Sequence, residues 1–267
     1  MADKYKLLLS IALVGCLSAC TTTEHQADQR LADQSMMAVN WMQQSGEYSA
    51  IARQTFRFAT DAYQQAVNKG IKSPAVIVDL DETMLDNSAY QAWAAAQQVP
   101  YTDKTWSQWV QAKQARAIPG SVEFAQYIDS HGGTLFYVSN RAEQDRQATV
   151  NNLQALGFPR VTDQTLLLKS TSSNKQTRFA SIRAKGFQVV VYVGDNLNDF
   201  GEATWHKDNV QRREFVNSNS DKFGTLYFLL PNPSYGDWES GLTQGYSSMT
   251  PTQKLNVRYQ QLRAWRP

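Results

Sequence analysis

Cysteine and histidine are scarce in this 267-residue sequence, and their scarcity excludes several kinds of site. The two cysteines, Cys16 and Cys20, both lie in the first twenty residues, and there are only three histidines. So few cysteines cannot form an internal disulfide framework or a cysteine-rich zinc site. Beyond residue 20 the chain has no thiol, which excludes a cysteine nucleophile. Three scattered histidines do not suffice for a binuclear metal centre built on histidine ligands.

Charge of one sign and long apolar runs are also lacking. The 26 lysines and arginines nearly balance the 24 aspartates and glutamates, for a net charge of +2. Binding to a nucleic acid polymer through bulk positive charge is therefore not expected. Hydrophobic residues make up 42% of the chain and aromatic residues 11%, which is typical of a folded globular protein. After residue 20 no apolar run is long enough to span a membrane.

The first twenty residues have the features of a bacterial lipoprotein signal. A short basic start precedes an apolar run over residues 7–17, which is shorter than the roughly 20 residues of a spanning helix. The run leads into Leu-Ser-Ala-Cys, which resembles the lipobox at which a signal peptide is cut and the cysteine is lipidated. We therefore predict a signal peptide over residues 1–19 and acyl chains, palmitate included, on Cys20.

The residues after Cys20 indicate where such a lipoprotein is held. Thr21 stands where an aspartate would resemble an inner-membrane retention signal, so we expect a lipid anchor in the bacterial outer membrane. Several acyl chains on one residue anchor a protein stably. Residues 21–30 are polar and lack periodicity, so residues 20–30 are predicted to form the lipid-anchored tether. An ordinary signal peptide with an incidental cysteine, or a buried N-terminal helix, is the alternative.

The pattern of residues 31–267 predicts one α/β domain. Residues 31–70 show helical spacing and predict two N-terminal helices that separate near Ser45 and Gly46. Beyond them, short apolar runs alternate with helical stretches, which is typical of a parallel sheet covered by helices on both faces. The runs lie at residues 75–78, 134–138, 166–168, 189–193 and 226–230, and the helical stretches near 121–130, 142–155, 174–185 and 197–205.

One connection in this pattern is unusually long. Residues 86–119 contain helical patterns at 90–98 and 105–115 but no predicted strand. Connections longer than about 15 residues are usually functional. In an open parallel sheet the ligand site lies at the carboxyl ends of the strands. We therefore expect residues 86–119 to form a small helical cap over those strand ends.

Two aspartates directly follow the first apolar run. Asp79 and Asp81 are two positions apart, so their side chains can face one cavity. A buried pair of like charges is costly unless a cation holds it, and carboxylate oxygens suit Mg²⁺. For an isolated Asp-Leu-Asp, a capped turn is the simpler explanation.

Polar groups at two other strand ends favour a site over a turn. The second run ends in Ser139 and Asn140, and the fourth leads into the segment from Asp195 to Asp199. Lys175 opens the helical stretch before the fourth run and is the basic candidate. Since the carboxyl ends of parallel strands meet at one edge of the sheet, these side chains are expected to gather there.

These motifs resemble those of the haloacid dehalogenase superfamily of phosphohydrolases. The matching segments are IVDLDETMLDNSAY at residues 77–90, FYVSNR at residues 136–141 and VGDNLNDF at residues 193–200. Within the superfamily the sequence is most similar to the bacterial class C acid phosphatases, the lipoprotein e(P4) family of outer-membrane 5′-nucleotidases. The resemblance implies a Rossmann-like three-layer αβα core with a parallel sheet, a small helical cap and N-terminal helices.

The resemblance assigns roles to the aspartates. It implies that Asp79 attacks phosphorus to form an aspartyl-phosphate, and that Asp81 protonates the leaving oxygen and then activates water. It implies that Mg²⁺ is held by Asp79, by the backbone carbonyl of Asp81 and by Asp195. Asp199 is expected to support these ligands.

The resemblance also implies which groups bind the phosphoryl oxygens. They are Ser139, the backbone of Asn140 and Lys175, which together supply positioning and positive charge. Lys169 lies in the same segment as Lys175 and is the alternative lysine.

Two aromatic residues are implied in substrate binding. In the resembled family, aromatics at the positions of Trp106 and Tyr235 sandwich the base or ring of a nucleotide. Stacking is worth about 1–3 kcal/mol per base and discriminates weakly among bases. We therefore expect hydrolysis of several 5′-nucleotides, nicotinamide mononucleotide among them, and of aryl phosphates. Interior packing is the alternative for both residues and the favoured explanation for Trp109.

The sequence thus predicts a Mg²⁺-dependent acid phosphatase and 5′-nucleotidase that acts on small phosphomonoesters. Two other functions stay open: a surface lipoprotein that binds haem or another ligand through its aromatics, and a phosphotransferase on the same fold. A homodimer through residues 31–70 and 246–265 is also left open.

Overall fold

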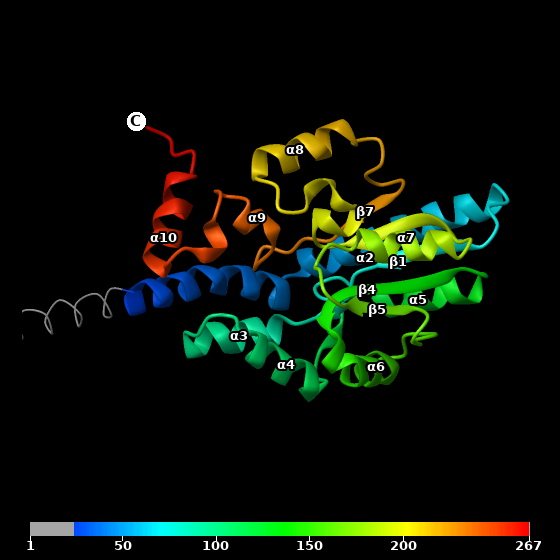
Figure 1. Ribbon diagram of the computed structural model, residues 1–267, viewed down its shortest axis with the longest axis horizontal. Helices are drawn as coiled ribbons and strands as arrows, with labels where there is room; N and C mark the ends of the chain where they lie inside the picture. The colour runs from blue at the N-terminus through cyan, green and yellow to red at the C-terminus, as the bar shows by residue number, and fades with distance from the viewer. Residues whose placement is uncertain (1–23, 267) are drawn as a thin grey trace, which may run out of the picture.

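The computed structural model describes residues 24–266, and its centre is a five-stranded parallel sheet (Figure 1). Each strand coincides with one of the five predicted apolar runs. The strand order is β5-β4-β1-β6-β7, so the first strand lies in the middle of the sheet. The strands are β1 (Pro74–Val78), β4 (Thr134–Ala142), β5 (Leu166–Lys169), β6 (Gln188–Gly194) and β7 (Tyr227–Leu229).

Helices join most of these strands, as the alternating pattern predicts. Besides the helix through residues 24–44, the α-helices are α2 (Gly46–Asn68), α3 (Ser88–Gln97), α4 (Asp103–Ala112), α5 (Ser121–Ser130), α6 (Arg146–Ala155), α7 (Gln176–Ala184), α8 (Asn209–Ser218), α9 (Asp237–Ser240) and α10 (Pro251–Gln260). The stretch predicted at 121–130 coincides with α5, and those at 142–155 and 174–185 contain α6 and α7.

The prediction of one helix over residues 197–205 is wrong. Two 3₁₀ turns, η2 (Leu197–Phe200) and η3 (Glu202–Thr204), take its place. Gly201 separates them with a φ of 147°, which no α-helix accommodates. Two further 3₁₀ turns are η1 (Glu143–Asp145) and η4 (Tyr246–Ser248).

Both faces of the sheet are buried, as the side chains of β1 show. Val76 and Val78 lie in one apolar cluster with Phe56 of α2, whereas Ile77 lies in a second cluster with Phe179 of α7. A strand that is apolar at every position is therefore required at the centre of the sheet. The predicted three-layer α/β architecture with a parallel sheet is confirmed.

The two predicted N-terminal helices separate where expected. The first helix runs through residue 44, and Ser45 caps α2 by accepting a hydrogen bond from the backbone N–H of Tyr48 at 3.1 Å. Gly70, just past the end of α2, has a φ of 75° that suits glycine. The helix α2 packs across the sheet and buries Tyr63 fully.

Residues 24–30, which were expected to belong to the tether because they lack periodicity, are helical. Ala27 is buried, the Glu24 carboxylate accepts a hydrogen bond from the backbone of Thr252, and Arg30 donates to Tyr259 of α10. The polar side chains thus face outward or toward α10, a partner that local sequence does not reveal. The predicted signal peptide and Cys20 lie outside the described residues. Among residues 24–266, no helix has the length and apolarity needed to cross a bilayer.

The segment predicted as a cap contains α3 and α4, close to the predicted helical patterns. The expectation that it has no strand is wrong. Its ends form a short antiparallel pair, β2 (Leu85–Asp86) and β3 (Arg116–Ala117), in which Leu85 pairs with Ala117. Two-residue strands are too short to show alternation in sequence. The assignment of residues 86–119 as a separate cap domain stays a prediction.

Candidate active site

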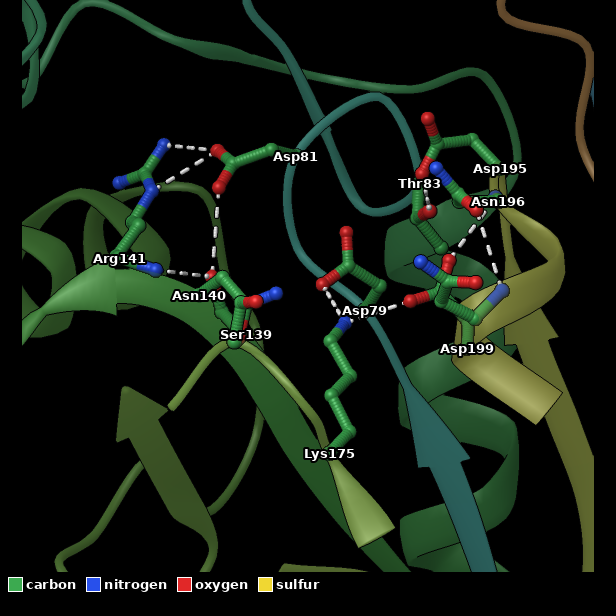
Figure 2. A network of polar contacts seen from close by, with 12 residues as sticks. Asp79, Asp81, Thr83, Ser139, Asn140, Arg141, Lys175, Asp195, Asn196 and Asp199 are labelled. Atoms are coloured by element: carbon green, nitrogen blue, oxygen red, sulfur yellow. Dashed lines mark hydrogen bonds and ion pairs between the residues drawn. The ribbon is translucent and has the colours of Figure 1, made fainter. Parts of the chain in front are cut away.

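The end of β1 carries the first motif aspartate into a tight turn. The backbone N–H of Asp79 still bonds to the carbonyl of Val193 on β6, at 3.0 Å. The carbonyl of Leu80 then accepts from the backbone N–H groups of residues 83–85, and Glu82 adopts a left-handed φ of 57°. This turn directs Asp79 and Asp81 to different neighbours (Figure 2).

Asp195 joins Asp79 because β6 lies beside β1 in the sheet. Asp199 follows on η2, where its carboxylate accepts from the backbone N–H of Asn196 while the Asn196 side chain caps the turn. Carboxylate oxygens of Asp79, Asp195 and Asp199 all lie within 4.8 Å of one another. A Cβ at Gly194 would lie only 2.3 Å from the Asp199 Cβ, so glycine is required there.

Lys175 reaches this acidic cluster from the start of α7. Its Nζ donates to Asp79 and, at 2.7 Å, to Asp199, and all three side chains are nearly fully buried. Of the two lysines that the sequence left open, Lys175 is therefore the one at the site. Lys169 is only half-buried and forms no ion pair in the described part of the chain.

Burial dominates the electrostatics of this cluster. It raises the pKa of the Asp79 carboxyl to about 7, against the opposing effect of the Lys175 ammonium, and Asp199 raises that pKa further. Burial and the neighbouring carboxylates also raise the pKa of Asp195 well above its usual range. Burial lowers the pKa of Lys175, but Asp199 and Asp79 outweigh it, so that pKa is raised and the ammonium form is favoured.

The donor set fits a hard divalent cation. Two buried carboxylates, Asp79 and Asp199, and the partly buried Asp195 face one ammonium, so the fully ionised cluster carries an excess of two negative charges. Such an excess is unfavourable in a dry site, as the raised pKa values of Asp79 and Asp195 indicate. Oxygen ligands are those that Mg²⁺ and similar cations prefer. Asp199, which the sequence assigned only a supporting role, belongs to the cluster itself.

The side chain of Asp81 lies outside this cluster. Its Oδ1 accepts from Arg141 Nε at 2.9 Å and from Asn87 Nδ2 at 3.0 Å, and Oδ2 accepts from Ser139 Oγ at 3.3 Å. Arg141 is 1% exposed and also donates to Thr149. Figure 2 shows this group beside the Asp79 cluster, with Ser139 and Arg141 from β4. The role of the Asp81 backbone carbonyl as a metal ligand stays a prediction.

Arg178 contacts the part of β4 that contains two of the predicted phosphate-binding residues, Ser139 and Asn140. Its guanidinium donates to the backbone carbonyl of Ser139 and to Asn140 Oδ1, both at 2.6 Å. Ser139 is buried and Asn140 is exposed. Arg178 lies one helical turn after Lys175, and this spacing is the signal that could have pointed to it.

The two predicted substrate aromatics lie on different sides of the turn that follows β1, one near Arg141 and the other at Glu82. Trp106 on α4 packs edge-on against Tyr90 at 5.2 Å, and its ring lies 5.8 Å from the Arg141 Cζ. The hydroxyl of Tyr235 donates to the buried carboxylate of Glu82. Both are half-buried, so each has some ring surface accessible to a ligand.

Several other residues at the site carry no role in the sequence prediction. Trp109, for which packing was favoured, donates to Asn87 at 2.8 Å and packs against the core. Arg141 shares a strand face with Ser139, two positions earlier, and that period was the available signal. Asn232, which donates to Asp195 at 2.9 Å, follows β7 and had no signal beyond its place after a strand.

Fold and site together define a phosphoryl-transfer protein of the haloacid dehalogenase type. A carboxylate follows the central strand, a lysine forms an ion pair with it, and two more carboxylates at the same sheet edge form an acidic cluster that could hold a cation.

Comparisons with known proteins narrow the class. A family model described as HAD superfamily, subfamily IIIB (acid phosphatase), matches residues 1–238, and the chain belongs to this family. It resembles the class C acid phosphatase from Bacillus anthracis, with a TM-score of 0.83, 32% identity, and coverage of 88% of this chain and 99% of that one. A structure of the class C acid phosphatase from Bacillus anthracis with tungstate bound gives a TM-score of 0.81, 31% identity and the same coverage.

A curated plant relative is more distant. The chain is 28% identical to acid phosphatase 1 from Solanum lycopersicum over 183 residues, which is 65% of this chain and 63% of that protein. The chain therefore aligns with less than two thirds of that relative's length. The sequence resemblance to class C acid phosphatases is confirmed, and with it the prediction of an enzyme of the acid phosphatase family.

Proposed function

We propose that this protein is a divalent-cation-dependent phosphomonoesterase that hydrolyses small phosphate esters through an aspartyl-phosphate. The observation that carries this proposal is the buried Asp79 carboxylate, which ends the central strand beside Lys175, Asp195 and Asp199. Of the reactions known for carboxylate nucleophiles, phosphoryl transfer suits a site with this concentration of charge.

The reaction divides into two steps on this chain's own residues. In the first, an Asp79 oxygen forms a bond to phosphorus, the ester P–O bond breaks, and Asp81 gives its proton to the leaving oxygen. In the second, Asp81 takes a proton from water, whose oxygen bonds to phosphorus and releases Asp79 and inorganic phosphate. The contacts of Arg141 and Ser139 with Asp81 support this role because they orient its carboxylate.

Charge neutralisation comes from the groups around Asp79. Lys175, Ser139 and the backbone of Asn140 are suited to bind the phosphoryl oxygens. A divalent cation, proposed to be Mg²⁺, would when bound by Asp79, Asp195 and the Asp81 carbonyl supply the positive charge that phosphoryl transfer requires. The related Bacillus anthracis structure with tungstate bound supports an oxyanion site in this fold.

The proposed substrates are 5′-nucleotides, nicotinamide mononucleotide among them, and aryl phosphates. Trp106 and Tyr235 are proposed to stack on the base or ring, and their half-buried rings support this. Aromatic faces accept any flat ring, so broad tolerance among bases is expected.

We also propose that acyl chains on Cys20 hold the protein at the outer membrane after removal of residues 1–19. Support comes from the order of basic start, apolar run and Leu-Ser-Ala-Cys in the sequence. Radiolabelled palmitate should be incorporated into the wild-type chain and not into Cys20→Ser. A homodimer stays a prediction, which light scattering of the purified protein would test.

Phosphate release from nicotinamide mononucleotide and an aryl phosphate, with Mg²⁺ and with excess chelator, tests the proposed activity. Activity is expected with Mg²⁺, not with chelator, and not in Asp79→Asn. Full activity in chelator or in Asp79→Asn would refute the mechanism. An added alcohol acceptor separates the phosphotransferase alternative, because phosphate would then appear on the alcohol instead of in water.

A further inference from the structure

A buried carboxylate outside the site joins α4 to the core. Asp145, the last residue of η1, is 1% exposed. Its Oδ1 accepts hydrogen bonds from Ser107 Oγ at 2.7 Å and from Gln111 Nε2 at 2.8 Å, both on α4. Ser107 and Gln111 are four positions apart and lie on one face of the helix. Two donors one turn apart on a single acceptor oppose both rotation and sliding of α4.

In the described structure, the Asp145 side chain makes no hydrogen bond other than those to Ser107 and Gln111. Within residues 24–266 it forms no ion pair, and its side chain makes no capping hydrogen bond to α6, although it is that helix's N-cap residue. The N-terminus of α6 favours a negative charge at this place. Burial of a carboxylate costs free energy unless hydrogen bonds replace its lost hydration. Its contacts therefore point to a positioning role.

The position of α4 determines where one of the proposed substrate aromatics lies. Trp106 precedes Ser107 on α4, and its ring lies 5.8 Å from the Arg141 Cζ. Arg141 in turn donates to Asp81, the proposed acid and base. A small rotation of α4 would therefore carry the indole away from the reacting centre, whereas Ser139 and Lys175 lie on β4 and at the start of α7.

We propose that Asp145 is a positioning residue for substrate choice. It holds α4 so that Trp106 can stack on the ring of an aromatic phosphomonoester, and it makes no contact with the phosphoryl group. The inference rests on the proposed phosphomonoesterase function. It predicts that loss of the Asp145 contacts affects substrates with a ring and spares those without one.

Steady-state kinetics on two substrates test this inference. The substrates are a 5′-mononucleotide and glycerol phosphate, which has the same reacting group but no ring. In Asp145→Ala, the KM for the nucleotide is expected to rise about 5- to 20-fold, the size of one lost base–aromatic contact. Its kcat and both constants for glycerol phosphate are expected to stay within about twofold of wild type.

A conservative variant and a double variant separate positioning from general damage. Asp145→Asn keeps an acceptor oxygen and is expected to recover most of the nucleotide KM. Asp145→Ala combined with Trp106→Ala is expected to raise that KM no further than Trp106→Ala alone, because both act through one contact. If Asp145→Ala does not fold, Gln111→Ala removes one of the two donors from an exposed position, with about a 2- to 4-fold rise expected.

A matched control comes from the same helix that Asp145 precedes. Gln147→Ala removes an exposed side chain of α6 that, among residues 24–266, bonds only to Asn151, and the activity on both substrates should stay unchanged. Equal losses on nucleotide and glycerol phosphate, an unchanged nucleotide KM in Gln111→Ala, or additive effects with Trp106→Ala would each overturn the inference. A wild-type enzyme without activity on either ester would instead overturn the proposed function.

Discussion

Gly194→Ala, at the end of β6, is expected to disrupt the acidic cluster by displacing Asp199. The added Cβ would lie 2.3 Å from both Cβ and Oδ2 of Asp199, whereas ordinary contact begins at 3.4 Å. Asp199 must therefore retreat by about 1 Å or the strand end must move. Asp199 Oδ1 now lies 2.7 Å from the Lys175 Nζ. A retreat of that size lengthens this bond beyond the usual hydrogen-bond range of about 3.5 Å.

Two measurements follow from this clash. Overpacking of this kind costs about 1–3 kcal/mol of unfolding free energy, and each kcal/mol lowers the Tm by about 2–4 °C in a domain of this size. Displacement of Asp199 should also weaken cation binding by about 10- to 100-fold, as loss of a supporting group does in other metal sites. Thermal unfolding and the Mg²⁺ dependence of kcat/KM report the two effects separately.

Gly46→Ala is the matched control. A Cβ there meets nothing within 4 Å, and the residue opens α2, so the variant should be neutral or slightly more stable. If Gly194→Ala keeps the wild-type Tm and Mg²⁺ dependence, then the close approach of Asp199 to the strand end does not determine the geometry of the site.

Three further predictions concern individual contacts. Tyr235→Phe keeps the ring but leaves Glu82 without its hydroxyl donor, so urea denaturation should show that the free energy of unfolding falls by about 1–3 kcal/mol. An unchanged urea midpoint would mean that this hydrogen bond does not stabilise the fold. Arg141→Lys loses the contact of two guanidinium nitrogens with Asp81. We expect kcat to fall about 100-fold, because small misplacements of reacting groups have effects of that size. A wild-type kcat would contradict the proposal that Arg141 orients Asp81. For Asp79, the folded pKa of about 7 exceeds the unfolded value, so its contribution to the stability of the cation-free protein declines as pH rises from about 4 to 7. Thermal unfolding in chelator should show this decline in wild type and a smaller one in Asp79→Asn, and equal declines would exclude it.

The strands and the motif aspartates were predictable because their signals are local. Continuous apolar runs such as residues 75–78 occur where a strand is buried on both faces. The polar residues that follow such a run in the sequence therefore lie at the end of the strand. Adjacent pairing of β1 and β6 then brings Asp79 and Asp195 together. These parts needed no information about distant contacts beyond the parallel order of the sheet.

The unpredicted parts depend on contacts between distant segments. The helix over residues 24–30 is joined by hydrogen bonds to α10, and the pairing of β2 with β3 joins residues about thirty positions apart. The side chain of Asp81 turns to Arg141 rather than to the other aspartates, which the period of two did not reveal. Asp145 had no sequence signal, because an acidic residue at a helix start usually faces solvent.

By itself, the sequence determined the α/β fold class, the positions of the five strands and the identity of the acidic residues at their ends. These follow from the spacing of apolar and polar residues over ten or fewer positions. Only the tertiary structure selected Lys175 over Lys169, joined Asp199 to the cation site and fastened α4 to Asp145. The reason is physical: burial and pairing of a charge depend on what packs around it, and those partners come from elements that meet only after the chain has folded.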